Sequence, residues 1–175
     1  MSIKKDVVMP VVVLTVICIV ISFLLALAND LTSPIIREAS ATRENDARKE
    51  IIPTAESFEL IENEHFDKAI KAVYASTNDV GYVITVISNG YGGEMTILIG
   101  IDASGLVSNV KLMKHSETAG LGAKTADNDY TNQYIGKDKN LDGIEAITGA
   151  TVSSRAFSSA VKDAFTAYEL VKGAE

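Results

Sequence analysis

The sequence contains few residues that bind metals or form cross-links: it has one cysteine, two histidines and no tryptophan. Cys18 lies inside a long apolar run, so no cysteine set is available for a disulfide framework, an iron–sulfur cluster or covalently attached haem. His65 has no second histidine or acidic cluster at ligand spacing near it, so we predict a surface residue and no metal site. Redox chemistry in this chain would therefore need another kind of cofactor.

Motifs of several nucleotide-binding and hydrolytic folds are also absent. The sequence has no Gly-Lys-Ser or Gly-Lys-Thr of a P-loop and no Gly-x-Ser-x-Gly nucleophile elbow. Gly90, Gly92 and Gly93 join two predicted strands and open no helix, so they are not a dinucleotide-binding fingerprint. The net charge of −7, which becomes −8 once residues 1–6 are excluded, argues against nucleic acid or an anionic lipid surface as a partner.

A long apolar run near the N-terminus predicts a membrane span. Residues 7–28 contain no charged side chain and as a helix would reach roughly 33 Å, enough to cross a hydrocarbon core. Ala26-Leu27-Ala28 resembles a signal-peptidase site, but the run is long for a cleaved signal, so we predict an uncleaved single span. Lys4 and Lys5 precede the span and the next basic residue is Arg37, which predicts a cytoplasmic tip (1–6) and an extracytoplasmic remainder in the cell membrane.

The remainder predicts a helical stalk and an α+β domain. Ser33-Pro34 is a helix-start signal, and the charged segment 29–52 is predicted to be a solvated stalk helix that ends before Pro53. In the domain, residues 53–175, the segment 54–76 is a short element followed by a short helix or strand. Hydrophobic periodicity and Gly-bearing turns then predict an antiparallel meander with flanking helices. The predicted strands are 81–88, 94–101 and 106–115, and the predicted helices are 127–136 and 152–170.

Four hydroxyl side chains gather where the last predicted helix begins: Thr148, Thr151, Ser153 and Ser154. A helix N-terminus presents unpaired N–H groups and the positive end of the helix dipole, which suits a phosphate. A Thr151 side chain that only caps the helix is the simpler interpretation, because such caps are very common. The local pattern leaves both interpretations open.

Four segments in this order resemble a known family. They are Gly90-Tyr-Gly-Gly93, Ile99-Gly-Ile-Asp102, His115-Ser-Glu-Thr-Ala-Gly-Leu-Gly122 and Ile147-Thr-Gly-Ala-Thr-Val-Ser-Ser154. Together with the N-terminal span, they resemble the membrane-anchored FMN-binding subunits of ion-pumping redox complexes. These are the G subunit of the Rnf complex and the C subunit of the sodium-pumping NADH:quinone reductase. The compact length and the His-x-Glu-Thr segment are closer to the Rnf G subunit.

The resemblance implies a covalent flavin. In that family FMN is esterified through its phosphate to the threonine at the position of Thr151, and a separate flavin transferase makes the bond from FAD with Mg²⁺. The remaining site residues implied are Tyr91, His115, Glu117, Thr118, Gly120, Leu121, Gly122, Thr148, Gly149, Ala150, Val152 and Ser153. Among these, His115 is equally explained as a capped strand end and Tyr91 as a turn residue that packs on its own sheet. Arg155 and Lys124 are candidates to neutralise the phosphate or are simply solvated. Two positions depart from the family pattern: Ala119 replaces the usual Pro, and Glu145 replaces the usual Asp.

The function implied is that of an electron-carrying flavoprotein subunit of an ion-translocating ferredoxin:NAD⁺ oxidoreductase, with no independent catalysis. Its partners would be the other subunits of the complex and the flavin transferase. An equivalent subunit of a quinone reductase, or of another extracytoplasmic electron-transfer chain, is the first alternative. A non-redox anchored binding module, in which Thr151 is only a cap, is the second.

Overall fold

The computed structural model describes residues 3–173, without the side chains of residues 3–7, 35, 37, 38 and 41. The chain divides into two compact units between Asn45 and Asp46. The first consists of most of helix α1 (Ile3–Ile51), and the second contains the last turns of α1 and all remaining elements. The predicted subdivision at residues 6, 28 and 52 stays a prediction.

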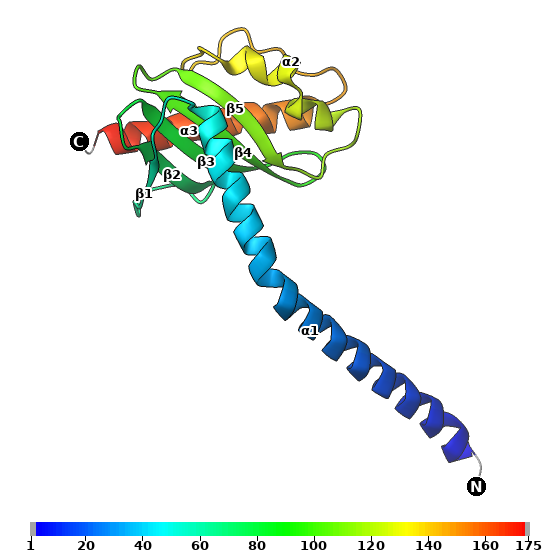
Figure 1. Ribbon diagram of the computed structural model, residues 1–175. Coiled ribbons are helices and arrows are strands. Elements are labelled where there is room, and N and C mark those ends of the chain that lie inside the picture. The colour runs from blue at the N-terminus through cyan, green and yellow to red at the C-terminus, as the bar shows by residue number, and fades with distance from the viewer. Residues whose placement is uncertain (1–2, 174–175) are drawn as a thin grey trace. The chain divides into compact units, whose positions relative to one another are not determined.

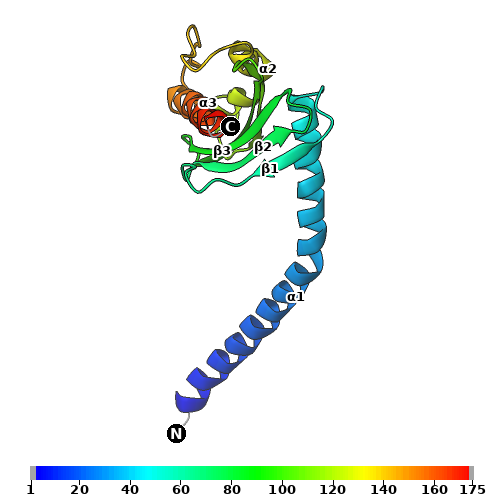
Figure 2. The ribbon, with the colours of Figure 1, turned by 90° about the vertical axis from the view of Figure 1, so that its left-hand side faces the viewer.

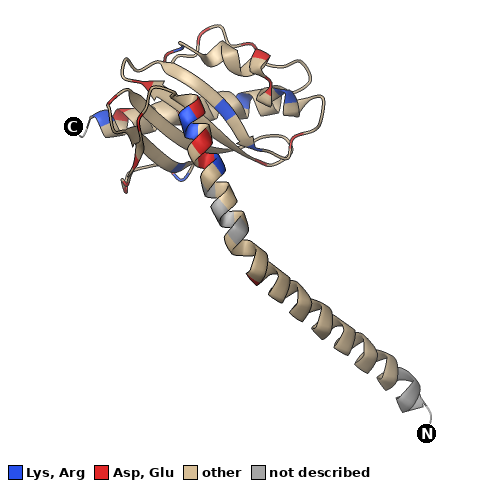
Figure 3. Ribbon diagram, in the orientation of Figure 1, with Lys and Arg blue, Asp and Glu red and all other residues tan. Residues whose placement is uncertain are grey.

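Helix α1 contains the predicted span. Its segment Val8–Pro34 contains an 18-residue stretch with a mean hydropathy of 3.2, and by length and composition the segment can cross a membrane. Figure 3 shows a long stretch of α1 without charged residues, followed by charges of both signs in its last turns. The predicted helix start at Pro34 was wrong, because Pro34 lies inside one continuous helix. The sequence has no glycine before Gly81, so no C-terminal stop signal interrupts the helix before Pro53.

The last turns of α1 are part of the domain core and not a solvated stalk. Ala47, Ile51 and Ile52 are buried in a cluster with Val83 and Leu98 of the sheet. Figure 2 shows these turns against one face of the sheet. We predicted a solvated helix because its apolar stripe is narrow. A narrow stripe is nevertheless enough for this packing, because only the last residues of α1 contact the sheet.

A five-stranded antiparallel sheet forms the centre of the domain (Figure 1). Its strands follow one another in space as in sequence: β1 (Phe58–Ile61), β2 (Ile70–Ser76), β3 (Gly81–Asn89), β4 (Glu94–Asp102) and β5 (Val107–Lys114). The last three confirm the predicted meander, and the undecided segment 54–76 supplies the first two. Asn89 pairs with Glu94, so residues 90–93 form the turn between β3 and β4.

Helix α3 (Thr151–Lys172) covers the other face of the sheet. Alternate strand residues such as Ile84, Val86, Ile97 and Ile99 pack with its buried stripe, which includes Phe157. The short helices η1 (Gly122–Ala126), α2 (Asn128–Thr131) and η2 (Asn132–Tyr134) lie between β5 and α3 in the chain. They correspond in part to the predicted helix 127–136. The α+β class with an antiparallel sheet and flanking helices is confirmed.

Candidate functional site

The N-terminus of α3 ends in unpaired backbone donors. Thr151 is the first helical residue and Ala150 occupies the N-cap position, where no side-chain hydrogen bond is made. The interpretation of Thr151 as the N-cap was therefore wrong: the cap is an alanine, which has no side-chain oxygen to offer. Among the described residues, no acceptor is found for the backbone N–H groups of Thr151, Val152 and Ser153. These three donors are available to a ligand.

The loop before α3 is held to the first turn of the helix. The Ala150 N–H donates to the Ile147 carbonyl at 2.9 Å, and Gly149 lies in the left-handed region with φ of +81°. The Ile147 N–H donates to the Ser154 Oγ at 3.0 Å. The Tyr130 hydroxyl donates to the Ser154 carbonyl at 3.2 Å. Thr151 is thus presented from a fixed loop on a buried, hydrogen-bonded helix end.

A cavity of about 530 Å³ opens at this helix end and is called the Thr151 cavity below. It is lined by ten residues from three segments: Tyr91, Glu117, Thr118, Leu121, Gly122, Gly149, Ala150, Thr151, Val152 and Ser153. All ten are among the predicted site residues, whereas the predicted Thr148, His115 and Gly120 do not line it. Its volume falls within the range of small-molecule and cofactor sites.

Apolar side chains and one buried carboxylate give the cavity its character. Tyr91 is 75% exposed, Val152 54% and Leu121 45%, so these three offer free apolar surface around the opening. Glu117 is buried; its Oε2 accepts from the Ser153 Oγ at 2.6 Å and its Oε1 from the Gly92 N–H at 3.0 Å. His115 lies beyond it and accepts from the Glu117 N–H through Nδ1 at 3.2 Å, so it supports the loop and does not face the cavity.

Comparison with known proteins places this site in a family. A family model described as an FMN-binding domain matches residues 90–166, a range that includes every residue lining the Thr151 cavity. The G subunit of the Na⁺-translocating ferredoxin:NAD⁺ oxidoreductase complex of Acetobacterium woodii is 31% identical, over 90% of this chain and 89% of that one. The G subunit of the ion-translocating oxidoreductase complex of Methanosarcina acetivorans is 32% identical, over 94% of this chain and 95% of that one. The chain belongs to the G-subunit family of ion-translocating oxidoreductase complexes.

Two further proteins are similar to this chain. The G subunit of the proton-translocating ferredoxin:NAD⁺ oxidoreductase complex of Clostridium ljungdahlii is 29% identical, over 86% of this chain and 85% of that one. The crystal structure of the C subunit of the Na⁺-translocating NADH-quinone reductase from Parabacteroides distasonis aligns with a TM-score of 0.47 and 18% identity, over 57% of this chain and 59% of that one. The G-subunit relatives thus include members of both sodium- and proton-translocating complexes.

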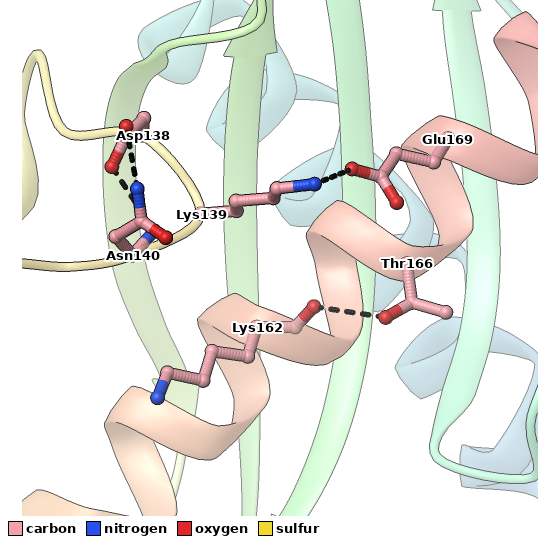
Figure 4. A network of polar contacts seen from close by, with 6 residues as sticks. All are labelled: Asp138, Lys139, Asn140, Lys162, Thr166 and Glu169. Carbon is pink, nitrogen blue, oxygen red and sulfur yellow. Dashed lines mark hydrogen bonds and ion pairs between the residues drawn. The ribbon is translucent and has the colours of Figure 1, made fainter.

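The cationic candidates of this G-subunit homologue line other cavities. Arg155 and Lys162 border a second cavity of about 350 Å³ with Tyr130 and Ser158, called the Arg155 cavity below. Figure 4 shows the Lys162 ammonium lying apart from the nearby Lys139–Glu169 pair, whose Nζ and Oε1 atoms are 2.9 Å apart. Lys124 borders a third cavity together with three acids, Asp127, Asp129 and Glu145. No Lys, Arg or His is therefore among the residues that line the Thr151 cavity.

Sequence reasoning missed two sets of residues that build the site. Gly90 and Gly92 contact Glu117, although they were predicted only as a permissive turn. Tyr130 and Tyr134 support the start of α3 through a hydrogen bond between their hydroxyls at 2.8 Å. The glycine turn was a visible signal, but its partner lies 25 residues away in the chain and no spacing rule connects the two.

Proposed function

We propose that this chain is the FMN-carrying electron-transfer subunit of an ion-translocating ferredoxin:NAD⁺ oxidoreductase, with the FMN phosphate esterified to Thr151. The family membership and the matched FMN-binding domain support the cofactor and the complex. The observation that carries the covalent attachment is the position of Thr151. This residue lines a cavity of cofactor size at a helix end with unpaired N–H groups and no cation in the lining.

The missing cation distinguishes a phosphodiester from a free phosphate. A phosphate monoester carries a charge of about −1.5 to −2 at neutral pH, and proteins commonly hold such a group with Arg or Lys. A diester carries a single negative charge. The N-terminus of a helix supplies the equivalent of about half a positive charge together with its free N–H donors. The lining therefore suits a phosphate whose second charge has been removed by esterification, and a covalent bond replaces the affinity that cations would give.

The residues around Thr151 have complementary tasks in this proposal. Val152 and Ser153 would present backbone N–H groups to the phosphate oxygens, together with that of Thr151. Leu121, Val152 and the Tyr91 ring would pack on the apolar faces of the isoalloxazine, and Thr118 would contact its polar groups. Bound FMN supplies the capacity to accept and pass on electrons, while the protein binds and orients it.

The bond would be made by phosphoryl transfer without any change in oxidation state. The Thr151 Oγ forms a bond to the FMN phosphorus of FAD, the pyrophosphate bond breaks, AMP leaves and the hydroxyl proton is released. A flavin transferase with Mg²⁺ would supply this chemistry, so Thr151 is an acceptor and not a catalyst. With the N-terminus in the cytoplasm, the domain would lie outside the cytoplasm, where a tether prevents loss of the flavin.

The experiment is co-expression of the full chain with a flavin transferase, followed by intact mass and in-gel flavin fluorescence. Wild type and Thr151→Ser should carry one FMN adduct, whereas Thr151→Ala should carry none. Thr148→Ala is the matched control, because Thr148 is exposed, belongs to the same loop and does not line the cavity. An adduct that survives Thr151→Ala, or is lost with Thr148→Ala instead, would refute the assignment. A wild-type chain without any adduct would favour a non-redox binding module.

A further inference from the structure

We propose that Glu117 is the positioning residue of the Thr151 cavity. In this proposal, Gly90 and Gly122 lack side chains so that the Glu117 carboxylate, and not the cofactor, can lie against them. The carboxylate holds the turn between β3 and β4 against the first turn of α3. This inference rests on the proposed function, since it assigns a role within the same site. Three features of the structure support it: hydrogen bonds, glycine contacts and the place of Ser153 in α3.

The hydrogen bonds join three segments that are far apart in sequence. Glu117 Oε1 accepts from the N–H of Gly92 in the β3–β4 turn, and Oε2 accepts from the Oγ of Ser153 in α3. Glu117 itself belongs to the loop after β5, and its own N–H donates to His115. Each of these segments contributes lining residues: Tyr91 from the turn, Leu121 from the loop and Thr151 from the helix. One carboxylate therefore connects every wall of the cavity.

The glycines of the motif fit closely around this carboxylate. A Cβ placed on Gly90 would lie 2.0 Å from Glu117 Oε1, and one placed on Gly122 would lie 2.2 Å from Oε2. A Cβ on Gly92 would lie 2.2 Å from the Ser116 carbonyl oxygen, next to Glu117 in the chain. Contacts this short do not occur in proteins, so any side chain at these positions would displace Glu117 or its loop. The absence of side chains at these glycines thus leaves space for Glu117 and its loop. Of the three glycines, only Gly122 also lines the cavity.

The carboxylate also lies where a helix stabilises negative charge. Ser153 is the third residue of α3, so its partner Glu117 lies beside the first turn, close to the positive end of the helix dipole. Hydrogen bonds to an ionised acceptor are stronger than those between neutral groups. Removing the carboxylate would leave a buried Ser153 hydroxyl and the Gly92 N–H without their acceptor, which favours separation of the turn from the helix.

The test uses the full chain produced without a flavin transferase, so that the first readout does not depend on flavin. We expect Glu117→Ala to accelerate amide hydrogen exchange in residues 90–93 by about tenfold or more, since both hydrogen bonds of this side chain are lost. Glu117→Gln should stay within about threefold of wild type, because its Oε1 still accepts from Gly92 and its amide donates to the Ser153 Oγ. The matched control is Glu94→Ala, an exposed carboxylate at the end of the same turn.

The second readout is the initial rate of FMN attachment by a fixed amount of transferase. It should fall several-fold in Glu117→Ala and return to near the wild-type rate in Glu117→Gln. If amide hydrogen exchange in residues 90–93 is equally fast in Glu117→Ala and Glu94→Ala, the proposal is wrong. It is also wrong if exchange in Glu117→Gln is as fast as in Glu117→Ala. If Glu117→Ala does not fold, Ser153→Ala removes only one of the two bonds and should give an intermediate exchange rate. A failure of Thr151 as acceptor would leave the exchange result unchanged, so the two proposals can be separated.

Discussion

Two cavities border the first turns of α3, and their linings have opposite electrostatic character. The Thr151 cavity is lined by residues 151, 152 and 153 of the helix and contains one carboxylate and no cation. The Arg155 cavity is lined by residues 154, 155, 158, 159 and 162 and contains two cations and several hydroxyls. The residue that accepts the flavin in our proposal thus lies in the cavity that lacks cations, while the cavity with cations lacks that residue.

The helical repeat explains only part of this difference. Residues three or four positions apart share one face of a helix, so Arg155, Ser158, Ser159 and Lys162 gather on one side of α3. Arg155 follows Thr151 by four positions and was a candidate for the phosphate on that ground. Thr151 nevertheless lines the other cavity, together with residues of the β3–β4 turn and of the loop after β5. Nearness in sequence to Thr151 therefore does not show which cavity a charged side chain lines. Substitutions in and around the two cavities test whether the two act independently.

The largest effect is expected from filling the floor of the Thr151 cavity. In Gly122→Ala the new Cβ would meet Glu117 Oε2 at 2.2 Å and the Ser153 Oγ at 2.6 Å. We expect a loss of about 2–3 kcal/mol of unfolding free energy from this overpacking, together with slower FMN attachment. Urea unfolding of the full chain in detergent, followed by circular dichroism, measures the first quantity.

The neighbouring glycine gives the matched control. Gly120 has φ of +76° and nothing within 4 Å of an added Cβ, so Gly120→Ala should cost only the backbone strain of about 1 kcal/mol. If both variants lost the same stability, the close packing around Glu117 would contribute nothing beyond backbone strain.

The next effect concerns the support beneath the Arg155 cavity. The fully buried Tyr134 hydroxyl is hydrogen-bonded to Ser158 Oγ and to the Tyr130 hydroxyl, each at 2.8 Å. Tyr134→Phe should therefore cost about 1–2 kcal/mol of unfolding free energy. Tyr91→Phe, at an exposed position, should change it by less than about 0.5 kcal/mol.

An alkaline titration adds a second measurement on the same side chain. Burial is the main cause that raises the pKa of Tyr134, and its hydrogen bond to the Tyr130 hydroxyl also raises it, whereas the hydrogen bond with Ser158 lowers it. The Tyr134 phenol should remain protonated where ordinary tyrosines ionise, near pH 10, as long as the domain is folded. A spectrophotometric titration in which Tyr134→Phe removes one tyrosine with an ordinary pKa would contradict this.

Much of the fold was predictable from local patterns, and the exceptions were long-range. The strands β3, β4 and β5 are rich in apolar and β-branched residues and are separated by glycine-bearing turns, so strand composition and turn chemistry agreed. The segment 54–76 mixes charges with unevenly spaced apolar residues, and only pairing with β3 makes β2 a strand. Ile51 and Ile52 follow a charged helix, and their burial depends on Val83 and Leu98, which no local pattern connects with them.

The site divides in the same way. The motif segments supplied every residue that lines the Thr151 cavity, because each motif is contiguous in sequence. Only the structure shows the hydrogen bond between Glu117 and Gly92, and only the structure shows that Arg155 and Lys124 line other cavities. The motif segments thus predicted which parts of the chain line the Thr151 cavity, whereas three-dimensional contacts showed which charged side chains lie outside it.

A smaller effect is expected from giving the Thr151 cavity the cation that it lacks. Val152 is about half exposed and lines the cavity, so a lysine there can reach the phosphate position without being buried. In a Thr151→Ala chain that lacks attached flavin, Val152→Lys should tighten binding of free FMN by about tenfold. Riboflavin has no phosphate and should gain no affinity from Val152→Lys, as measured by quenching of flavin fluorescence. Equal affinity for FMN with and without Val152→Lys would show that a cation at this position does not act on the phosphate.

The smallest effect is expected from removing the cations of the other cavity. Arg155 and Lys162 are exposed and form no ion pair among the described residues, so the double variant Arg155→Ala with Lys162→Ala should fold normally. Because both side chains border the Arg155 cavity, the fraction of chain with attached FMN and the initial attachment rate should match wild type. The matched control for the change in net charge is Lys111→Ala with Lys139→Ala, which removes two cations that pair with Glu50 and Glu169 and border neither cavity. A loss of attached FMN in the Arg155 and Lys162 variant, but not in this control, would mean that Arg155 and Lys162 act on the phosphate, or on the transferase that delivers it, across the helix. The two cavities would then act as one electrostatic site, and our inference that they are independent would be wrong.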